Sequence, residues 1–429
     1  MRVLVIGSGA REHALARRLS SDSGISDLLC VPGNPGVAGV ARVAAGDPSR
    51  HEGIAALADL ARRERIDLTI VGPEVPLSLG VVDRFTAEGR LIVGPTAAAA
   101  RLESSKAFAK SFMQRHGVPS ARFAICESAE EGLAQIGSGA FGLPVVVKAD
   151  GLAAGKGVVI ATSREEAEAA VLAAMRERRF GDAGARLVIE ECMTGPEVSF
   201  FALSDGERAV PIGTAQDHKR IFDEDRGPNT GGMGAFAPSP LVDRALETRI
   251  VQEIVNPVVS GMASEGYPFR GFLYAGLMLT PTGPKVIEFN ARLGDPETQV
   301  ILPRITDPLL PILVASASGK LGQSTCSMSS DKFVGVVVAS RGYPESSESG
   351  RPIAGVEAAD AIPGVSVLHA GTAIRDGRLV TAGGRVLTVV GQGQDFPEAI
   401  ARAYAGVLQI SFDGMQYRRD IGRKALAFR

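Results

Sequence analysis

The sequence lacks an excess of charge of either sign. Its 429 residues include 46 Lys and Arg against 48 Asp and Glu, which leaves a formal net charge of −2. A chain without an overall positive field is poorly suited to hold nucleic acid or an anionic membrane surface. We therefore expect no nucleic-acid partner. At about 150 residues per domain, the length predicts roughly three domains.

Long apolar runs and a cysteine framework are also missing. The longest apolar runs, such as residues 309–317, are shorter than the ~20 residues that span a bilayer. The four cysteines are scattered and form no CxxC pair, so neither a disulfide scaffold nor a zinc site is expected. No charged-then-apolar leader precedes the first predicted strand, which starts at residue 2, so we expect no secretory signal. These features predict a cytoplasmic protein that is not bound to a membrane.

Lysine is scarce, because the chain uses arginine as its main cation. Several of the few lysines stand beside glycine-rich turns, namely Lys106, Lys148, Lys156 and Lys219. A lysine ammonium is a compact charge that suits phosphate oxygens, although random placement explains the same pattern. The motifs around these lysines are needed to distinguish phosphate binding from random placement.

The N-terminal part of the chain alternates strands with helices. Short apolar runs at 2–6, 68–72 and 91–94 are predicted strands, and residues 52–64 form one of the helical stretches between them. Such alternation is typical of a parallel, doubly wound sheet. We therefore predict an α/β domain over residues 1–103.

The rest of the chain has a mixed, partly α+β character. Residues 144–149 and 157–161 are β-branched runs, and a helix with an acidic first turn is predicted at 164–178. Residues 216–234 are predicted to form a long polar loop, and loops of that length are usually functional. A last unit, mainly of strands, opens at residue 332.

Polar turns follow several N-terminal strands. Residues 7–9 lie between a strand and a helix, where backbone N–H groups and the helix dipole attract an anion, and Arg11 and His13 add donors. Glu12 stands where a dinucleotide pattern requires a third glycine, so a single phosphate is favoured over NAD. The other two turns are residues 32–36 and 72–74. All three turns are expected at the carboxyl edge of the sheet, unless they only end their strands.

A glycine-rich loop at residues 150–157 joins two predicted strands and contains Lys156. A Walker A loop would need glycine at 150 and a hydroxyl at 157, and it would lead into a helix, so the pattern does not match. We interpret the loop as a hairpin flap that closes over phosphates, with Lys148 reaching the same phosphates from the preceding strand. A flexible hairpin without a ligand is the alternative.

Two further motifs carry hard oxygen atoms. Glu288 and Asn290 lie two residues apart in a predicted strand at 284–291, so both point to one face, which suits Mg²⁺ bridging a nucleotide. An edge strand whose polar face is exposed to solvent explains this pattern about as well. Glu190, beside a second glutamate at a strand end, could accept from an exocyclic amine, and Glu197 from ribose hydroxyls. Two solvated glutamates are the simpler explanation of that spacing.

Together the motifs resemble the ATP-grasp superfamily and, within it, the phosphoribosylamine–glycine ligase family. The resemblance covers essentially the whole chain. It rests on residues 3–15, 32–36, 71–77, 147–157, 216–220, 227–234 and 288–297, of which 147–157 and 227–234 are highly specific. The resemblance implies an N-terminal pre-ATP-grasp domain at 1–103, a central ATP-grasp domain at 104–124 plus 191–330, a lid at 125–190 and a β-rich C-terminal domain at 331–429.

The resemblance also implies an activity and its ligands. The family joins glycine to 5-phosphoribosylamine at the expense of ATP, through glycyl phosphate, in purine biosynthesis. ATP would be a substrate, Mg²⁺ or Mn²⁺ the metal, and the chain a monomer. Another ATP-grasp carboxylate–amine ligase, an NAD-dependent oxidoreductase and a non-catalytic nucleotide-binding protein stay open as alternatives.

Site residues are implied position by position. Those implied to bind ATP are Lys106, Lys148, Gly151, Gly155, Lys156, Gly157, Glu190, Glu191, Met193, Glu197 and Phe289. Those implied to bind the metal are Glu288 and Asn290. Those implied to bind phosphoribosylamine or glycine are Gly7, Gly9, Arg11, Glu12, His13, Gly33, Asn34, Gly36, Glu74, Asp217, Lys219, Arg292 and Gly294. Those implied to act in catalysis are Lys148, Arg292 and Asp217.

Overall fold

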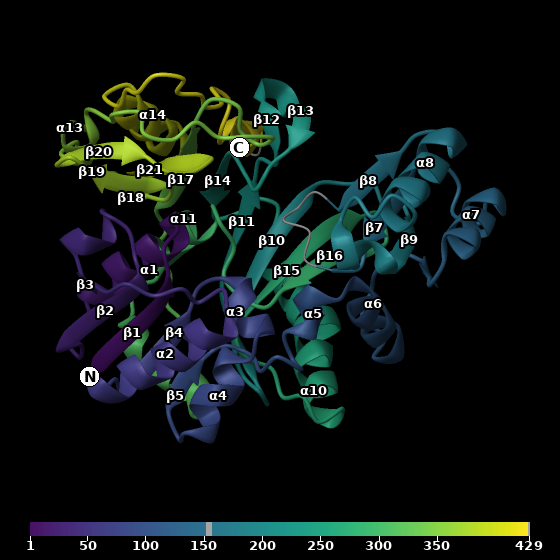
Figure 1. Cartoon of the computed structure of the whole chain (residues 1–429), viewed down its shortest axis with the longest axis horizontal. Helices are drawn as coiled ribbons and strands as arrows, with labels where there is room; N and C mark the ends of the chain where they lie inside the picture. The colour runs from purple at the N-terminus through teal and green to yellow at the C-terminus, as the bar shows by residue number, and fades with distance from the viewer. Residues whose placement is uncertain (152–156, 428–429) are drawn as a thin grey trace.

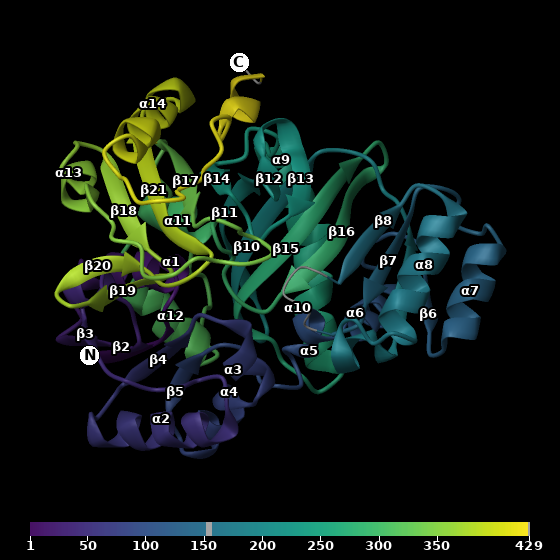
Figure 2. The same ribbon diagram turned by 45° about the horizontal axis from the view of Figure 1, so that its top comes forward.

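The computed structural model describes residues 1–151 and 157–427. In Figure 1 the N-terminal sheet lies below the C-terminal strands, the strands of residues 197–290 run beside both, and a small lid stands at the far end. Figure 2 shows the same separation of the lid from a second direction. Within the described residues, every helix is too short or too polar to cross a membrane.

The N-terminal sheet is parallel, with strand order β3-β2-β1-β4-β5. Its strands are β1 (Arg2–Gly7), β2 (Asp27–Pro32), β3 (Arg42–Val43), β4 (Leu68–Val71) and β5 (Leu91–Val93). Its helices are α1 (Ala10–Ser20), α2 (His51–Arg63), α3 (Glu74–Ser78) and α4 (Val81–Ala87). Leu4 and Val5 of β1 enter two different hydrophobic clusters, so both faces of the sheet are buried. The predicted doubly wound α/β sheet is confirmed.

The lid is an antiparallel sheet of order β6-β9-β7-β8. Its elements are β6 (Phe123–Cys126), α7 (Ala129–Gly137), β7 (Val145–Ala149), β8 (Val158–Ala161), α8 (Arg164–Met175) and β9 (Leu187–Glu191). Ser163 caps α8 by accepting a hydrogen bond from the backbone of Glu166. The helix predicted for 164–178 ends at Met175, and Arg178 adopts a φ of 51° that no α-helix contains.

The central sheet has the order β16-β15-β10-β11-β14-β17-β21-β18. Its strands are β10 (Glu197–Asp205), β11 (Ala209–Asp217), β14 (Gly234–Ala237), β15 (Arg270–Thr280), β16 (Gly283–Asn290), β17 (Lys332–Ala339), β18 (Val365–His369) and β21 (Arg385–Gly393). β14 pairs with β17 over four residues. The backbone ladder therefore runs without interruption across the boundary predicted at residue 331.

The remaining C-terminal elements cover this sheet. They are α13 (Val356–Asp360), β19 (Thr372–Arg375), β20 (Arg378–Thr381) and α14 (Phe396–Val407). β19 and β20 form a separate hairpin, and α14 packs on β21 and β17. Asp395 caps α14 by accepting from the backbone of Glu398.

The prediction of a long polar loop over residues 216–234 is wrong in its inner part, where the chain forms two paired strands. β12 (Arg220–Phe222) and β13 (Arg226–Asn229) pair as a hairpin, and the strands on either side reach into the segment. All four residues of β13 are exposed, so no apolar alternation marks it in the sequence. The hairpin is held from outside, because Arg418 donates to the Arg220 carbonyl and to Asp225.

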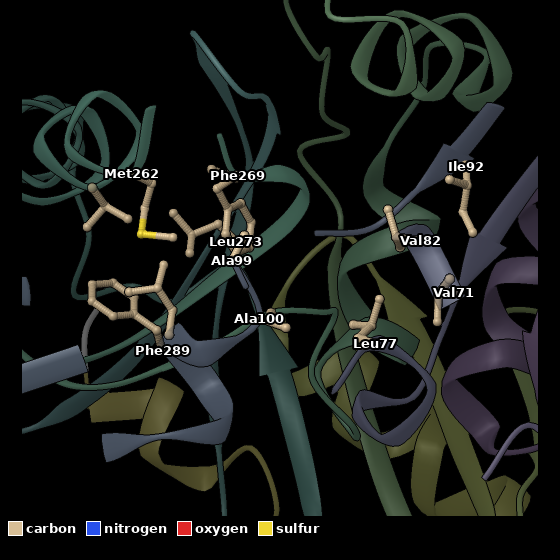
Figure 3. Packing of buried hydrophobic residues seen from close by; sticks show 14 of the residues in the cluster. Val71, Leu77, Val82, Ile92, Ala99, Ala100, Met262, Phe269, Leu273 and Phe289 are labelled. Carbon is tan, nitrogen blue, oxygen red and sulfur yellow. The ribbon is translucent and has the colours of Figure 1, made fainter. Parts of the chain in front are cut away.

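A helical layer supports the far side of the central sheet. Its members are α5 (Arg101–Ser104), α6 (Lys106–Arg115), α9 (Arg244–Ile250) and α10 (Asn256–Ser264), and a π-helical turn at Val251–Val255 joins the last two. Figure 3 shows Phe289 of β16 against Met262 of α10, and the same cluster extends to Leu77 and Val82 of the N-terminal unit. α11 (Thr298–Ile301) and α12 (Leu309–Ala317) fill the space between the two sheets.

Candidate functional site between the lid and the central sheet

Cationic side chains line the place where the lid meets the body. Lys148, at the end of β7, places its Nζ 3.0 Å from Glu190 Oε1 and 3.3 Å from the carbonyl oxygen of Ile287 in β16. Lys106, the first residue of α6, donates to the Gly151 carbonyl at 3.0 Å. Both lysines therefore lie at the base of the glycine-rich loop, as a phosphate-binding site requires.

Asp150 fixes the entry to that loop. Its carboxylate accepts from the backbone N of Ala107 at 2.7 Å, from Ser105 Oγ at 3.0 Å and from Arg186 Nε at 2.7 Å. The exit is tied by the hydrogen bond from Ala149 N to the Gly157 carbonyl. Residues 152–156, which include the predicted ligands Gly155 and Lys156, lie outside the described residues.

Glu288 and Asn290 share one face of β16. They stand opposite Gly276 and Tyr274 of β15, whereas Phe289 between them turns into the hydrophobic core (Figure 3). Burial alone would raise the pKa of Glu288, but the cations Lys219, Lys148 and Lys106 outweigh it and hold the pKa below its ordinary value. Glu288 is therefore an ionised carboxylate placed among cations.

The pair fits a divalent metal that is held mainly by phosphates. With its amide oxygen and nitrogen exchanged, the Asn290 side chain donates at 3.1 Å to Glu103 Oε1 and to the Phe289 carbonyl, so these two acceptors fix its orientation. Over the described residues, no group of three or more His, Cys, Asp or Glu side chains could hold a metal by itself. Mg²⁺ commonly takes only one or two protein oxygens and completes its shell with substrate phosphates and water.

Arg292 connects the end of β16 to the N-terminal unit. Its guanidinium lies 2.9 Å from Glu103 Oε1 and 3.4 Å from Glu74 Oε2. Burial opposes the charge, yet Glu103 and Glu74 hold the pKa of Arg292 above its ordinary value. Glu103 was missed by the sequence analysis, because nothing around it in the chain marks it as a partner of residues 290–292.

A second group of charges surrounds Asp217 at the end of β11. Lys219 Nζ lies 2.9 Å from Glu197 Oε2, and Lys219 also faces Asp217. Burial, together with Glu197 and Glu288, raises the pKa of Asp217 against the opposing effect of Lys219. Asp217 and Lys219 thus lie near Glu288, and their role as substrate residues stays a prediction.

Glu297 is a further buried acid that the sequence analysis quoted in a motif but gave no role. It accepts from Ser199 Oγ at 3.1 Å, and Ser199 Oγ is 3.2 Å from the Tyr274 hydroxyl. Burial, with a contribution from Asp217, raises the pKa of Glu297 to about 7. A Cβ at Gly294 would come within 2.5 Å of this carboxylate, so glycine leaves the space that Glu297 occupies.

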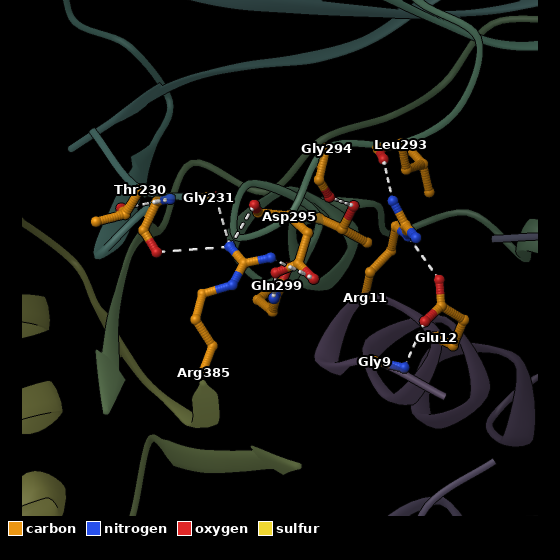
Figure 4. A network of polar contacts seen from close by, with 12 residues as sticks. Gly9, Arg11, Glu12, Thr230, Gly231, Leu293, Gly294, Asp295, Gln299 and Arg385 are labelled. Carbon is orange, nitrogen blue, oxygen red and sulfur yellow. Dashed lines mark hydrogen bonds and ion pairs between the residues drawn. The ribbon is translucent and has the colours of Figure 1, made fainter. Parts of the chain in front are cut away.

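The turn after β1 is built around Glu12. Glu12 Oε2 accepts from the backbone N of Gly9 at 2.6 Å, and its other oxygen accepts from Arg11 Nε, as Figure 4 shows. A Cβ at Gly7 or Gly72 would come within 2.6 Å of the Glu12 side chain. Glu12 is thus buried beneath the turn and fixes its shape, while Arg11 also donates to the Leu293 carbonyl at 3.1 Å.

Asn34 and His13 join this turn to the C-terminal strands. Asn34 Nδ2 donates at 2.8 Å both to the Ser8 carbonyl and to the His369 carbonyl. His13 Nδ1 accepts from the backbone N of His369 at 2.9 Å. A Cβ at Gly36 would meet the His13 ring at 2.4 Å and the His369 ring at 2.6 Å, so this glycine permits the contact between the two units. Gly33, at the start of the same turn, adopts a φ of 66° that favours glycine.

Arg385 of β21 reaches into the same region from the C-terminal part. Its guanidinium donates to the carbonyls of Gly231 and Asp295 and lies 3.2 Å from Asp295 Oδ2 (Figure 4). Asp295 also accepts from Gln299 at 2.7 Å. One side chain thus holds the glycine-rich segment before β14 and the segment after β16 together. Sequence analysis missed Arg385, because its strand carries no motif.

The other predicted ligands lie near the lid edge. Glu191 forms an ion pair with Arg122, with 2.6 Å between Oε2 and Nε, and so faces away from Glu190. Met193 is half-buried in the segment that links β9 to β10, and Glu197 is exposed at the start of β10. These positions bring Glu190, Met193 and Glu197 along one edge of the site.

A lid sheet over an antiparallel sheet, with lysines and a carboxylate–amide pair between them, defines an ATP-grasp enzyme. Family models match three consecutive parts of the chain. They describe the N domain of phosphoribosylglycinamide synthetase at residues 1–103, its ATP-grasp domain at 104–298 and its C domain at 333–424. The chain belongs to the phosphoribosylglycinamide synthetase family.

Full-length relatives support this assignment. The chain is 49% identical to phosphoribosylamine–glycine ligase from Xanthomonas axonopodis, over all of this chain and 98% of the relative. It is 48% identical to the ligase of the same name from Vibrio parahaemolyticus, over 100% and 99% of the two chains. Both relatives are named as ligases. Their names therefore do not support the alternatives of an NAD-dependent oxidoreductase or a non-catalytic nucleotide-binding protein.

Solved structures share the fold. Phosphoribosylamine–glycine ligase from Thermotoga maritima superposes with a TM-score of 0.85 at 33% identity and covers 98% of this chain and 100% of its own. A biotin carboxylase from Campylobacter jejuni, solved as a complex with an ATP analogue, gives a TM-score of 0.73 at 16% identity over 99% of this chain and 95% of its own. The second likeness concerns the fold alone.

Proposed function

We propose that this ATP-dependent carbon–nitrogen ligase joins glycine to 5-phosphoribosylamine and releases glycinamide ribonucleotide, ADP and phosphate, as a step of purine biosynthesis. The observation that carries the proposal is the setting of Glu288. Its carboxylate lies among four cations, namely Lys148 of the lid, Lys106 of α6, Lys219 and Arg292. An ionised carboxylate thus lies where groups suited to a triphosphate and groups suited to an amino acid come together.

The nucleotide would bind between the lid and β16. Lys106 and Lys148 supply positive charge for phosphate oxygens at the base of the glycine-rich loop. The backbone near Met193 would hold the adenine, with Glu197 near the ribose, whereas both oxygens of the Glu190 carboxylate already face lysines within the chain. Glu288 and Asn290 would hold Mg²⁺ or Mn²⁺, which when bound neutralises charge on the phosphate oxygens.

Glycine would bind on the other side of Glu288. The Arg292 guanidinium suits its carboxylate, since Glu103 and Glu74 keep that side chain charged and oriented. Asp217 suits the ammonium group, and Lys219 beside it limits the local excess of negative charge. Gly294 leaves room for the Glu297 carboxylate at the same place.

Phosphoribosylamine would bind over the N-terminal turns. Backbone N–H groups of the turns near Gly7 and Gly36 suit its phosphate, and α1 directs the positive end of its dipole there, whereas the N–H of Gly9 donates to Glu12 and that of Gly33 to the Gly7 carbonyl. The contacts of Glu12 and Asn34, and of His13 through Nδ1, argue that these side chains shape the turns rather than face the ligand. Glu74 opens α3 at the neighbouring strand end.

The reaction divides into two substitutions. An oxygen of the glycine carboxylate attacks the γ-phosphorus of ATP, and the bond to the ADP oxygen breaks. The amine of phosphoribosylamine then attacks the acyl carbon of glycyl phosphate, inorganic phosphate leaves, and the amine loses a proton. Lys148 and Arg292 position the reacting groups and offset their charge, which is the main requirement of phosphoryl transfer. A closed lid protects the acyl phosphate from water.

We further propose the four-domain division at 1–103, 104–124 plus 191–330, 125–190 and 331–429. The uninterrupted sheet from β14 to β17 argues that the last division is one of function and not of independent folding. We propose that the protein acts as a monomer in the cytoplasm, with small molecules as its partners.

The proposal is tested by following ADP release. Purified protein is given ATP, Mg²⁺, glycine and phosphoribosylamine, and each small molecule is then omitted in turn. We expect ADP release to require glycine and product formation to require both. ADP release that is independent of glycine would instead point to an ATP-grasp ligase with a different acid.

A further inference from the structure

A buried lysine behind the candidate nucleotide site has no part in the function proposed above. Lys110 lies one turn after Lys106 on α6 and is 2% exposed. Its Nζ lies 3.0 Å from Glu190 Oε2 and 5.8 Å from the centre of the Phe123 ring. Burying an ammonium group costs free energy of folding unless a buried anion accompanies it. The buried position of Lys110 beside Glu190 therefore requires an explanation.

Glu190 is shared between two lysines from different parts of the molecule. Lys148 of the lid strand β7 approaches Oε1, and Lys110 of the body helix α6 approaches Oε2, each at 3.0 Å. All three side chains are buried. The group therefore contains one negative and two positive charges, and one of the cations is in excess.

Of the two cations, Lys148 is the one that also faces the candidate metal ligands. It contacts the Ile287 carbonyl, next to Glu288, so its ammonium already lies on that side. Lys110 instead lies between Glu190 and the Phe123 ring. Burial lowers the pKa of Lys110, and Glu190 opposes that effect.

Without Lys110, Lys148 would be the only cation paired with Glu190. If Lys148 turned toward a phosphate, the buried carboxylate would lose its counter-ion, and breaking a buried ion pair in this way costs several kcal/mol. That cost would be subtracted from the binding of the phosphate. With Lys110 in place, the carboxylate keeps one ammonium throughout.

We propose that Lys110 is a positioning residue that serves as the permanent counter-ion of Glu190, and that it thereby releases Lys148 to the phosphates of a nucleoside triphosphate. The inference rests on the proposed nucleotide site but assigns a residue that touches no substrate. The expected effect of Lys110 on binding differs between the two parts of the nucleotide. Lys110 should matter for the phosphate part of the nucleotide and much less for the nucleoside part.

The test compares two ligands on the full-length chain. Calorimetric titrations measure the affinity of a non-hydrolysable ATP analogue with Mg²⁺ and of adenosine, and the ratio of the two affinities is the readout. For Lys110→Met we expect the analogue to bind about tenfold more weakly and adenosine to change by less than about twofold. Lys110→Arg keeps the charge and should keep the ratio. Lys320→Met, at an exposed lysine, is the matched control.

Removing the carboxylate gives an independent comparison. If Lys110 acts only through Glu190, then in the Glu190→Gln background the further change Lys110→Met should alter the ratio by less than about twofold. The double variant leaves neither the buried carboxylate nor the Lys110 ammonium unpaired, so its ratio should also stay within about twofold of the wild-type ratio, and this comparison decides the matter if a single variant does not fold.

Parallel losses of both ligands in Lys110→Met, or an unchanged ratio, would overturn the inference and leave Lys110 as a structural tie between lid and body. A drop of the ratio within the Glu190→Gln background would overturn it as well. Failure of the wild-type chain to bind the triphosphate analogue is a different result, since it would contradict the proposed function and the inference together.

Discussion

At the scale of single residues, the site depends on charges that are kept ionised in a buried place. Glu288 is the clearest case, because three lysines outweigh the effect of its burial. A glutamine at this position keeps the shape and the hydrogen-bonding capacity of the side chain but removes its charge. The cations around it would then lose their common partner, and a metal would lose its charged ligand.

We therefore expect Glu288→Gln to lower kcat by at least about 100-fold while the thermal unfolding midpoint stays close to that of the wild type. Steady-state ADP release and a melting curve measure the two quantities. Glu253→Gln, an exposed glutamate paired with Arg249, is the control and should retain activity. Near-normal turnover in Glu288→Gln would refute the metal assignment.

Buried histidines give a residue-scale prediction about pH. Burial, with a contribution from His369, lowers the pKa of His13 to about 3 from an ordinary 6.5. Between these two values the unfolded chain binds a proton that the folded chain does not, so the stability from this site is complete above pH 6.5 and is lost as the pH falls toward 3.

We expect His13→Asn, which keeps an acceptor for the His369 backbone, to remove this dependence. Between pH 6 and pH 4 the free energy of unfolding of the wild type should fall more steeply than that of the variant, by about 1.4 kcal/mol per pH unit. Urea unfolding at several pH values measures the difference. Equal slopes in the two proteins would show that His13 is not the titrating group.

At the scale of elements, two features could be predicted from the sequence. Side chains alternate between the two faces of a strand, so Glu288 and Asn290 of β16 were predicted to share one face, and the alternation of strands with helices predicted the N-terminal sheet. Local pattern is enough for such features. It could not find Glu103 or Lys110, because their partners Arg292 and Glu190 are far along the chain and meet them only after folding. The exposed hairpin of β12 and β13 was missed for lack of any apolar alternation.

The turn after β2 offers an element-scale prediction with a control three residues away. Alanine at Gly36 would place a methyl group 2.4 Å from the His13 ring, whereas alanine at Gly39 would meet nothing within 4 Å. We expect Gly36→Ala to destabilise the protein by about 1–3 kcal/mol through overpacking, and Gly39→Ala to have little effect. Chemical denaturation of both variants is the measurement. Equal stabilities would mean that the turn relaxes freely.

At the scale of the whole molecule, the site combines segments from every part of the chain. Arg385 illustrates this, because a C-terminal side chain holds the carbonyls of Gly231 and Asp295 in the central part. Such a contact fixes where two substrate-side segments lie relative to each other. Small displacements of reacting groups have large effects on rate.

We expect Arg385→Met to lower kcat/KM by roughly 10- to 100-fold although the residue binds no nucleotide. Arg378→Met, at an exposed arginine of the nearby hairpin, should behave as the wild type. Product formation at varied glycine and phosphoribosylamine measures the effect. Unaltered kcat/KM in Arg385→Met would show that the two segments hold their positions without the arginine.

The pairing of β14 with β17 also bears on protein engineering. Since these strands share one ladder, a chimera that exchanges the C-terminal quarter between relatives at residue 331 would put strands of different ancestry side by side in the middle of a sheet. A protein ending at that point would instead present an open strand edge, which invites self-association. Recombination sites are better chosen around the lid, whose own four-stranded sheet is complete in itself.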